Sequence, residues 1–334
     1  MGFKDQLKKI LTGLTVPQEY CCLELENLEG GLRVFLTLKN QHFLAEVSQS
    51  HLFLGYKPLV IGLSFTMNSA GHKKLETEND VCLNFVYGTF ELNTTWMGFP
   101  TDKRVVARLT LRKIHKKIVD DHVVMFYEGT FGRHEFLNPI HQFINHQNEK
   151  FKRRPADNVG LPGNLQDQVR IAYAIPRSIA VITISDGLLL NMFPTDLHGP
   201  VGDEVYVGSL RIGGKANEQV ERYKKLVVSE VETTFYKKAY KLGKNHMSTL
   251  SGKDRFSVYH ERSEIFNIPL PDAVVSYREL RQVDSFDHGI HRIHFYEVIS
   301  HKVLYQDRRS LAHIHQYYAQ WRIDQRLKTT LFFR

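Results

Sequence analysis

The sequence predicts a mainly β protein that consists of two tandem copies of one small β-barrel with added helices. Three observations support this prediction. The chain has 334 residues, a length that suits about two domains of ordinary size. One segment recurs without a gap in the second half of the chain, and both halves contain paired apolar runs separated by hairpin turns.

The strongest repeat aligns Arg104–Gly129 with Ala273–Val298, at a constant shift of 169 residues (273 minus 104). Eight of the 26 aligned positions are identical, whereas average composition gives about one or two. The identical pairs are Val105/Val274, Val106/Val275, Leu111/Leu280, Arg112/Arg281, His122/His291, Phe126/Phe295, Tyr127/Tyr296 and Glu128/Glu297. This excess of identities indicates an internal duplication.

Two weaker repeats occur in the same order along the chain. Val34–Phe85 aligns with Ala180–Val231 at a shift of 146 (180 minus 34), and Ile140–Phe143 is similar to Ile314–Tyr317. The first of these alignments pairs Thr37 with Thr183, Gly62 with Gly208 and Val81 with Val227. The two shifts differ by 23 (169 minus 146), which predicts an insertion of about that length in the second copy.

The predicted domain boundaries follow from these repeats. We expect a first barrel domain at 1–150, a linker at 151–165 and a second barrel domain at 166–334 with an insertion near 231–272. The linker begins with a basic run and is rich in proline and glycine, which is typical of a solvated connection. The lysines of the insertion favour a solvated helical segment, with a lid over an anionic ligand as the alternative; they are Lys237, Lys238, Lys241, Lys244 and Lys253.

Each copy is expected to open with a β-hairpin followed by a buried strand. The first hairpin is predicted around Lys39–Gln41 and the second around Ser185–Gly187, where Asp-Gly is a strong turn pattern. The flanking strands are predicted at 34–38 and 42–47 in the first copy and at 179–184 and 188–193 in the second. The next strand is predicted at 59–65 and at 205–212.

A helix, a strand, a long hairpin and a second helix complete each predicted copy. The helices are predicted at 73–79 and 216–225, the strands at 81–87 and 226–231, and the hairpins at 105–130 and 274–304. Asn138-Pro139 is a suitable cap and first turn for a helix through Asn145. Its counterpart is predicted from an apolar helical face at Leu311, Ile314, Tyr318, Trp321 and Gln325, and the N-terminal run Met1–Leu14 predicts an amphipathic helix.

Composition limits the compartment and the partners. Three cysteines, two of them adjacent, cannot build a disulfide framework, so we expect a reducing, cytoplasmic location. No apolar run reaches the roughly 18–20 residues that cross a bilayer, and we expect no membrane partner. The net charge of +8 favours anionic ligands. Because the basic runs match a linker and a half-exposed strand, we expect nucleotides and no nucleic acid.

Short motifs in the second copy follow a characteristic order. Arg177–Thr183 (RSIAVIT) is followed by the Asp186-Gly187 turn, by Asn191–Thr195 (NMFPT) and by Lys215–Asn217 (KAN). Near the end comes Ile290–Val298 (IHRIHFYEV). The first copy adds Lys57-Pro58-Leu59-Val60 and a closing DDHVVMFYEG segment at 120–129. In this order, the motifs resemble the flavin reductase-like family of FMN-binding split barrels.

The resemblance implies two tandem split barrels that pair as an intrachain pseudo-dimer, with FMN or FAD bound between them and NAD(P)H as the reductant. It implies cofactor contacts from the second copy; the candidate residues are Thr183, Asn191, Thr195, Asp196, His198, Arg211 and Lys215. Lys215 follows Gly213-Gly214 at a predicted helix start, a suitable place for a phosphate. Hydride transfer to a flavin needs no obligatory side-chain acid or base, so no catalytic residue is named.

Departures from the family pattern leave a second interpretation open. Ala45 and Glu46 align with Asn191 and Met192, which places a carboxylate in the first copy where a phosphate is expected. The second copy has Asp203-Glu204 in place of the family's Pro-Pro pair. The alternative function is therefore a non-catalytic binding or scaffold protein that has lost the cofactor, and whether the pseudo-dimer forms a further homodimer is left open.

Other classes of site are disfavoured by spacing. The sequence lacks phosphate loops of the G-x-x-x-x-G-K-[ST] and G-x-G-x-x-G types and lacks the G-x-S-x-G nucleophile motif. His288, His291 and His294 recur every three residues on a predicted strand, and so point to alternate faces. His313 and His315, interpreted as helical, do not converge either. No metal site is therefore expected.

Overall fold

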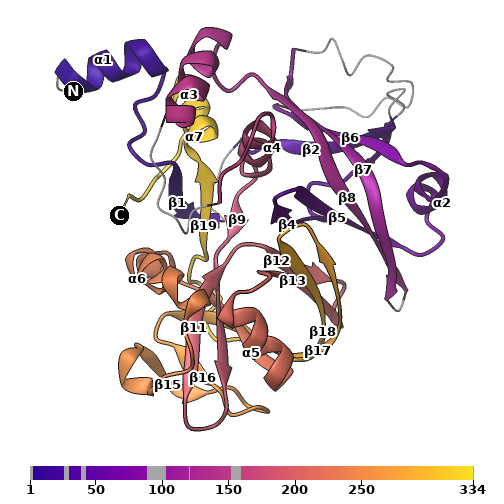
Figure 1. Cartoon of the computed structure of the whole chain (residues 1–334), viewed down its shortest axis with the longest axis vertical. Helices are drawn as coiled ribbons and strands as arrows, with labels where there is room; N and C mark the ends of the chain where they lie inside the picture. Colours follow the sequence, from indigo (N-terminus) through magenta and orange to yellow (C-terminus); the bar gives the residue numbers. More distant parts are fainter. Residues whose placement is uncertain are drawn as a thin grey trace.

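The computed structural model of the chain describes residues 3–25, 30–38, 43–88, 103–119, 121–151 and 159–333. Within these residues, most strands belong to two seven-stranded antiparallel sheets, which occupy different parts of the molecule (Figure 1). The predicted turn at 39–41 and residues 152–158 of the predicted linker lie outside the described residues. The predicted mainly β fold is confirmed.

The two large sheets have the same strand order. The first contains, from edge to edge, β3 (Phe43–Glu46), β2 (Arg33–Leu38), β6 (Asp80–Val86), β7 (Val105–Val119), β8 (His122–His134), β5 (Leu59–Thr66) and β4 (His51–Tyr56). The second contains β11 (Leu190–Thr195), β10 (Ala180–Ser185), β14 (Lys225–Val231), β17 (Val274–His288), β18 (His291–Val303), β13 (Val205–Arg211) and β12 (His198–Val201). Each strand of one sheet thus has a counterpart in the other, which confirms the duplication.

The long hairpins also share their irregularities. Strands β7 and β8 shift register between Thr110 and Leu111 and again between Lys113 and His115. Strands β17 and β18 shift register between Glu279 and Leu280 and again between Gln282 and Asp284, at positions 169 residues later. Because β-bulges are specific features of a strand pair, two matching bulges confirm the gapless alignment.

The strand register corrects part of the alignment of the leading blocks. Strand β5 pairs Gly62 with Phe126, and strand β13 pairs Val207, not Gly208, with Phe295. The predicted match of Gly62 with Gly208 is therefore one residue out, and the match of Val81 with Val227 is out by one for the same reason. Thr37 and Thr183, in contrast, occupy equivalent positions in β2 and β10.

In each copy, a helix connects two strands that are not neighbours in the sheet. Helix α2 (Ala70–Thr77) begins after Ser69, whose hydroxyl accepts a hydrogen bond from the backbone N–H of His72. Helix α5 (Lys215–Tyr223) occupies the corresponding place in the second copy and follows Gly213, whose φ of +79° suits glycine. Two further helices are α1 (Phe3–Thr12) and α3 (Pro139–Phe151).

The C-terminal segment differs from the prediction. Leu311–His315 forms strand β19 and the helix α7 begins only at Gln316 and ends at Asp324. Strand β19 lies between β1 (Tyr20–Glu24) and β9 (Arg177–Ser178) in a three-stranded sheet that joins both ends of the chain to the connection between the copies. Pairing with β1 across almost the whole chain overrides the local helical pattern. The sequence similarity between Ile314–Tyr317 and Ile140–Phe143 therefore does not reflect a shared structure.

The two copies pack through equivalent faces. Apolar side chains of β4, β5 and β8 meet those of β12, β13 and β18 in one buried cluster; its members are Leu52, Leu54, Val60, Val124, Phe126, Val201, Val205, Val207, Ile293 and Phe295. Phe126 and Phe295 are equivalent residues, and their ring centroids are 5.7 Å apart at 86°. A residue that contacts its own equivalent lies on a two-fold axis, so the chain forms an intrachain pseudo-dimer.

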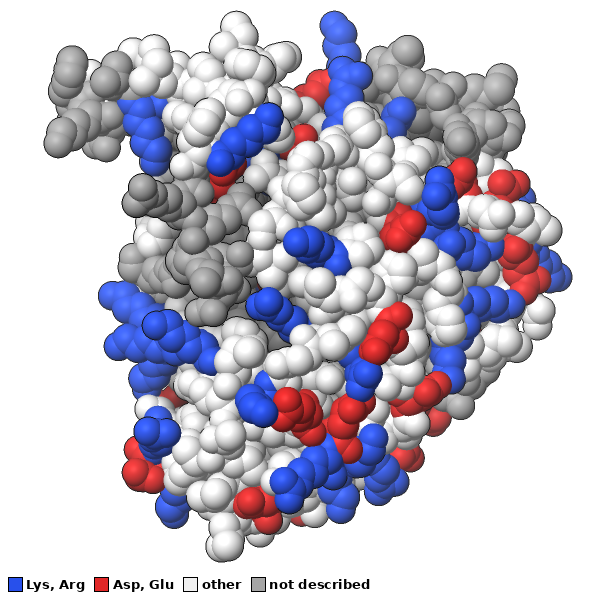
Figure 2. Space-filling view, in the orientation of Figure 1, with Lys and Arg blue, Asp and Glu red and all other residues white. Residues whose placement is uncertain are grey.

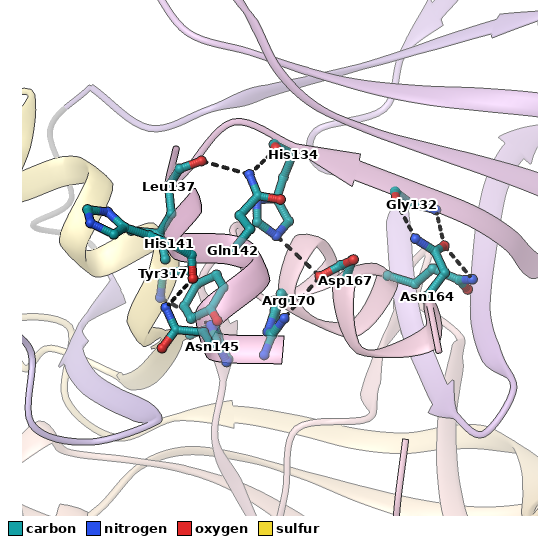
Figure 3. Close-up of polar contacts among 12 residues, drawn as sticks. Gly132, His134, Leu137, His141, Gln142, Asn145, Asn164, Asp167, Arg170 and Tyr317 are labelled. Carbon is teal, nitrogen blue, oxygen red and sulfur yellow. Dashed lines mark hydrogen bonds and ion pairs between the residues drawn. The ribbon is translucent and has the colours of Figure 1, made fainter. Parts of the chain in front are cut away.

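Helix α4 (Leu165–Ala172) connects the copies and docks on the first sheet (Figure 3). Asn164 accepts a hydrogen bond from the N–H of Gly132 (2.6 Å) and donates one to its carbonyl (2.7 Å). Asp167 Oδ1 lies 3.0 Å from Arg170 Nη1 and 3.5 Å from His134 Nε2. The Arg170 guanidinium in turn covers the Tyr317 ring at 4.2 Å. These polar contacts hold α4 between β8 and α7.

A segment of short elements lies between β14 and β17 of the second copy, at the place where the sequence predicts an insertion. Its elements are η2 (Thr233–Phe235), α6 (Tyr236–Leu242), η3 (Gly243–Met247), η4 (Lys253–Arg255), β15 (Val258–Arg262) and β16 (Pro269–Pro271). Ser251 and Leu190 exchange two backbone hydrogen bonds, so the insertion extends along the edge strand β11. Among the described residues, every helix is too short or too polar to pass through a lipid bilayer.

Candidate functional site

A pocket of about 150 Å³ lies in the second copy, where the insertion meets the end of β11. Its lining residues come from four segments; they are Ile179, Pro194, Thr195, Asp196, Ala239, Tyr240, Gly243 and His313. Helix α6 forms one wall, because Ala239 is buried in an apolar cluster with Ile179 and Met192. Strand β19 brings His313 from the C-terminal segment to the opposite wall. The pocket therefore depends on segments more than 100 residues apart.

Asp196 is the acidic group of this pocket. Its Oδ2 atom accepts hydrogen bonds from Tyr173 Oη and from His313 Nε2, both at 2.6 Å. Burial opposes ionisation of the carboxyl, but the hydrogen bond and charge of His313, together with Tyr173, outweigh it and lower the pKa of Asp196 to about 2. Asp196 is consequently ionised at neutral pH.

His313 is oriented by this carboxylate. Since ionised Asp196 only accepts, His313 carries a proton on Nε2, and its other ring nitrogen is Nδ1. That Nδ1 atom is buried and has no hydrogen-bond partner among the described residues. Tyr20 stacks on the imidazole at 5.4 Å and Tyr173 meets it edge-on at 5.1 Å. The carboxylate and the two aromatic side chains thus fix the orientation of the imidazole ring.

Of the seven residues predicted from the sequence, Thr195 and Asp196 line the pocket. Asn191 lies on the same strand but is covered by α5 and the insertion, since its Nδ2 contacts Gln219 Oε1 of α5 and the Asn245 and Ser248 carbonyls of the insertion. Thr183 is buried on the neighbouring strand β10, and its hydroxyl has no partner among the described residues.

The other three predicted residues lie outside the pocket lining. His198, at the start of β12, contacts Tyr206 Oη at 2.5 Å and the Ser178 carbonyl at 3.2 Å, and burial lowers its pKa. Arg211 ends β13 opposite His291. Lys215 begins α5, and its Nζ forms an ion pair with Glu218 at 2.8 Å. The seven predicted residues are therefore not gathered in one pocket.

Sequence reasoning missed His313 and the α6 residues. His313 was assigned to a helix, whereas the alternation of Leu311, His313 and His315 in the sequence is also compatible with a strand. His315 lies in that strand as the cap of α7, accepting a hydrogen bond from Tyr317 N at 3.1 Å. No local pattern indicates that Ala239 and Tyr240 face Thr195, because that contact depends on how the insertion folds back. The described residues contain no group of three side chains able to hold a metal ion.

The pocket fits a flavin only in part. Its walls are largely apolar, as a flat ring system requires, but a volume of about 150 Å³ is below the roughly 300–1,000 Å³ of typical ligand pockets. No lysine or arginine lines it, so it lacks a partner for a phosphate. In this conformation, part of a ring fits inside and a complete nucleotide does not.

The equivalent place in the first copy holds an ion pair between Arg33 and Glu46. Strand register aligns Glu46 with Pro194, since each lies opposite equivalent residues, Phe35 and Val181. Glu46 Oε1 accepts hydrogen bonds from Arg33 Nε at 3.0 Å and from Ser48 Oγ at 2.8 Å. The predicted alignment of Glu46 with Met192 is thus wrong by two residues. The carboxylate is neutralised by Arg33.

A second pocket, of about 340 Å³, lies in the first copy between α3 and the start of α4 (Figure 3). Its lining residues are Gln142, Phe143, His146, Gly163, Asn164 and Asp167. Gln142 and Asn164 use their amide groups to hold the backbone of His134, Leu137 and Gly132. These polar groups thus serve the docking of α4, and none of the predicted site residues is among them.

Comparison with known proteins gives matches among solved structures. No family model matches the chain, and no curated protein matches it. The NADH:FAD oxidoreductase SgcE6 of Streptomyces globisporus C-1027 is 15% identical, with a TM-score of 0.41, over 54% of this chain and 99% of that protein. The flavin reductase PheA2 is 12% identical, with a TM-score of 0.37, over 50% and 97%. An FMN-binding protein from Thermus thermophilus is 14% identical, with a TM-score of 0.36, over 46% and 80%. The chain is thus similar, over about half its length at a time, to flavin reductases and FMN-binding proteins.

Proposed function

We propose that the protein is a flavin-dependent oxidoreductase that binds FMN at the second copy, between the two barrels, and accepts hydride from NADH or NADPH. One observation carries the proposal: Thr195 and Asp196, chosen from the sequence as cofactor contacts, line a pocket with largely apolar walls next to the connection between the copies. A bound flavin would supply the redox chemistry, which no side chain provides alone.

The chain's own residues have defined tasks in this proposal. Ile179, Pro194 and Ala239 provide an apolar surface that excludes water from a ring. Thr195 and the ionised Asp196 offer acceptors for the N–H groups at a ring edge. His313 holds Asp196 in place through its Nε2 proton. For a complete nucleotide to bind, the α6–η3 segment has to move away from β11, because it limits the volume of the pocket.

The test is a spectrum and an assay of the purified protein. We expect flavin absorption in the protein as isolated, or quenching of FMN fluorescence on titration, and oxidation of NADH or NADPH that depends on added FMN. Ala239→Leu, which fills the pocket, is expected to weaken FMN binding, whereas Lys238→Ala on the exposed side of α6 is the matched control. A colourless protein that neither quenches FMN nor oxidises a nicotinamide nucleotide contradicts the proposal.

A second candidate function is supported by the same geometry. The Asn191 Nδ2 atom donates to the insertion, Lys215 is paired with Glu218, and the pocket is smaller than a nucleotide. These features suit a duplicated barrel that has lost its cofactor and serves as a binding protein. Under this alternative, flavins leave the melting temperature unchanged and no nicotinamide nucleotide is oxidised.

We also propose a reducing, cytoplasmic location. Cys21 and Cys22 are buried and Cys82 is half-buried, and these cysteines form no disulfide within the described residues. Cysteines without disulfides are typical of proteins in a reducing compartment. Imaging of the tagged protein in its own cells, together with thiol labelling of freshly lysed material, checks this proposal.

A further inference from the structure

A stripe of three lysines runs along α6 and η3. Lys237, Lys241 and Lys244 are separated by four and three residues, the spacing that brings side chains to one face of a helix. All three are exposed. Figure 2 shows lysine and arginine side chains gathered over α6, at the left of the view. The lysine stripe lies on the segment that also supplies Ala239, Tyr240 and Gly243 to the pocket lining.

Within the described residues, the lysines of the stripe lack the ion pairs that neighbouring lysines form. Lys238 pairs with Asp272 at 2.5 Å, and Lys215 pairs with Glu218 at 2.8 Å. No ion pair within the described residues involves Lys237, Lys241 or Lys244. Like charges at helical spacing repel one another and destabilise a helix. A bound anion would remove this repulsion.

The position of the stripe follows from the residues between its members. Ala239, Tyr240 and Gly243 line the pocket, and Lys241 and Lys244 are the chain neighbours of Tyr240 and Gly243. The stripe therefore occupies the face of the segment that adjoins the pocket-lining face. A molecule that enters the pocket passes beside these ammonium groups.

The size of the pocket and the charges around it indicate where the two ends of such a molecule would bind. The pocket of about 150 Å³ holds a ring or part of a ring system and leaves the rest of a nucleotide outside. Inside, the buried and ionised Asp196 repels an anion. Outside, three ammonium groups attract one. Both conditions are met when an uncharged ring lies inside the pocket and the phosphate lies on the lysine stripe.

We propose that the lysine stripe Lys237, Lys241 and Lys244 binds the phosphate monoester of a nucleotide whose ring end enters the pocket. The inference rests on the proposed function, and it places the phosphate on the insertion and not on Lys215, the residue that the sequence indicates. The phosphate belongs either to FMN or to the 2′-phosphate of NADPH. Both carry the same dianionic group, and matched ligands without it exist for each.

Binding measurements with two ligand pairs test the proposal. FMN is compared with riboflavin, and NADPH with NADH, by fluorescence titration at low and at moderate salt. The wild-type protein should bind at least one phosphate-bearing member roughly tenfold or more tightly than its partner, the value of one charge-assisted contact. Added salt should reduce this preference, because exposed charges are screened.

Three variants locate the phosphate. Lys241→Glu/Lys244→Glu should abolish the preference and leave riboflavin or NADH binding unchanged. Lys103→Glu/Lys253→Glu makes the same charge change at two other exposed lysines and should retain it, as should Lys215→Glu. Thermal melting checks that each variant is folded.

The outcomes separate the two proposals. If FMN and riboflavin fail to bind but NADPH binds through Lys241 and Lys244, the flavin function is wrong and the phosphate site stands. If riboflavin binds as tightly as FMN and NADH as tightly as NADPH, the phosphate site is wrong even though a flavin binds. Loss of the preference in Lys215→Glu alone would assign the phosphate to α5 and overturn the inference. A wild-type protein that binds none of the four ligands overturns both.

Discussion

The two copies share their sheets but not their surfaces at the edge next to β3 and β11. Strand order and both bulges of the long hairpin are the same in the two sheets. At the equivalent edge, the first copy has the Arg33–Glu46 ion pair, whereas the second has Ile179 and Pro194 in the wall of a pocket covered by α6. The two copies therefore keep the same strand arrangement, whereas the side chains at this edge differ between them.

A buried polar site shows the same divergence inside the barrels. In the first copy, Asn84 Nδ2 donates to Thr37 Oγ1 at 3.1 Å, and Arg108 Nε donates to Asn84 Oδ1 at 2.7 Å. In the second copy, the equivalents of Thr37 and Asn84 are Thr183 and Ser229. Neither hydroxyl has a hydrogen-bond partner among the described residues. One copy thus has a connected hydrogen-bond network where the other has two isolated hydroxyls.

The pseudo-two-fold interface offers the largest expected effect. Phe126→Ala and Phe295→Ala each remove a fully buried ring from the contact between the copies. Each should lower the free energy of unfolding by about 3–5 kcal/mol, as measured by urea denaturation. Phe131→Ala, at a ring that is 53% exposed, is the control and should change it little. Because the interface is shared, one cooperative transition is expected, and two separated transitions would show that the copies fold independently.

Acid titration should produce the next largest effect, centred on His51. Burial, with a smaller contribution from Arg177, lowers the pKa of His51 to about 3. The unfolded chain therefore binds more protons than the folded protein between about pH 6.5 and 3, and stability falls as the pH falls through that range. From pH 7 to pH 5, this histidine should cost about 2 kcal/mol.

His51 and His198 occupy equivalent positions in β4 and β12, so the comparison extends to the second copy. Burial also lowers the pKa of His198, but Asp196 and the Ser178 carbonyl oppose the shift. Unfolding curves at pH 7 and pH 5 should show that His51→Gln removes more of the acid sensitivity than His198→Gln does. The exposed His260→Gln serves as control, and equal effects of all three variants would refute this assignment.

The strands could be predicted because the sequence patterns that identify them are local and occur in both copies. Alternating apolar residues and the Asp186-Gly187 turn identify strands and hairpins, and eight identities in Arg104–Gly129 fix the alignment of the long hairpin. The alignment of Gly62 is wrong by one residue because it rests on isolated identities, which constrain register weakly. Leu311–His315 was interpreted as helical because its partner, β1, lies almost 300 residues earlier in the chain.

The pocket was only half predictable. Thr195 and Asp196 follow a motif whose order is visible in the sequence, and both line the pocket. Ala239 and Tyr240 reach it through the folding of an insertion that has no repeat to compare with. His313 reaches it through the central strand of a small sheet built from three distant segments. Residues that meet only through long-range packing leave no periodic pattern in the sequence.

The buried threonines should respond in opposite directions to one substitution. Thr37→Val removes the acceptor for Asn84 Nδ2 and should cost about 1 kcal/mol of stability. Thr183→Val removes a buried hydroxyl without a described partner and should be neutral or stabilising by up to about 1 kcal/mol. Chemical denaturation of both variants makes the measurement. A loss of stability in Thr183→Val would mean that this hydroxyl has a partner, such as a bound water.

The smallest expected effect concerns the ion pair that distinguishes the first copy's edge. The hydrogen bond from Arg33 lowers the pKa of Glu46, so the pair is charged at neutral pH. Both side chains are about one-third exposed, at 36% and 31%, and such pairs contribute about 0–1 kcal/mol. A double-mutant cycle with Glu46→Gln and Arg33→Met should therefore give a coupling below about 1 kcal/mol that decreases with salt. A coupling of several kcal/mol would make the pair a structural requirement of the first barrel. A small one means that exchanging it for Ile179 and Pro194 costs the fold little, which is how one copy acquires a pocket while both keep the same sheet.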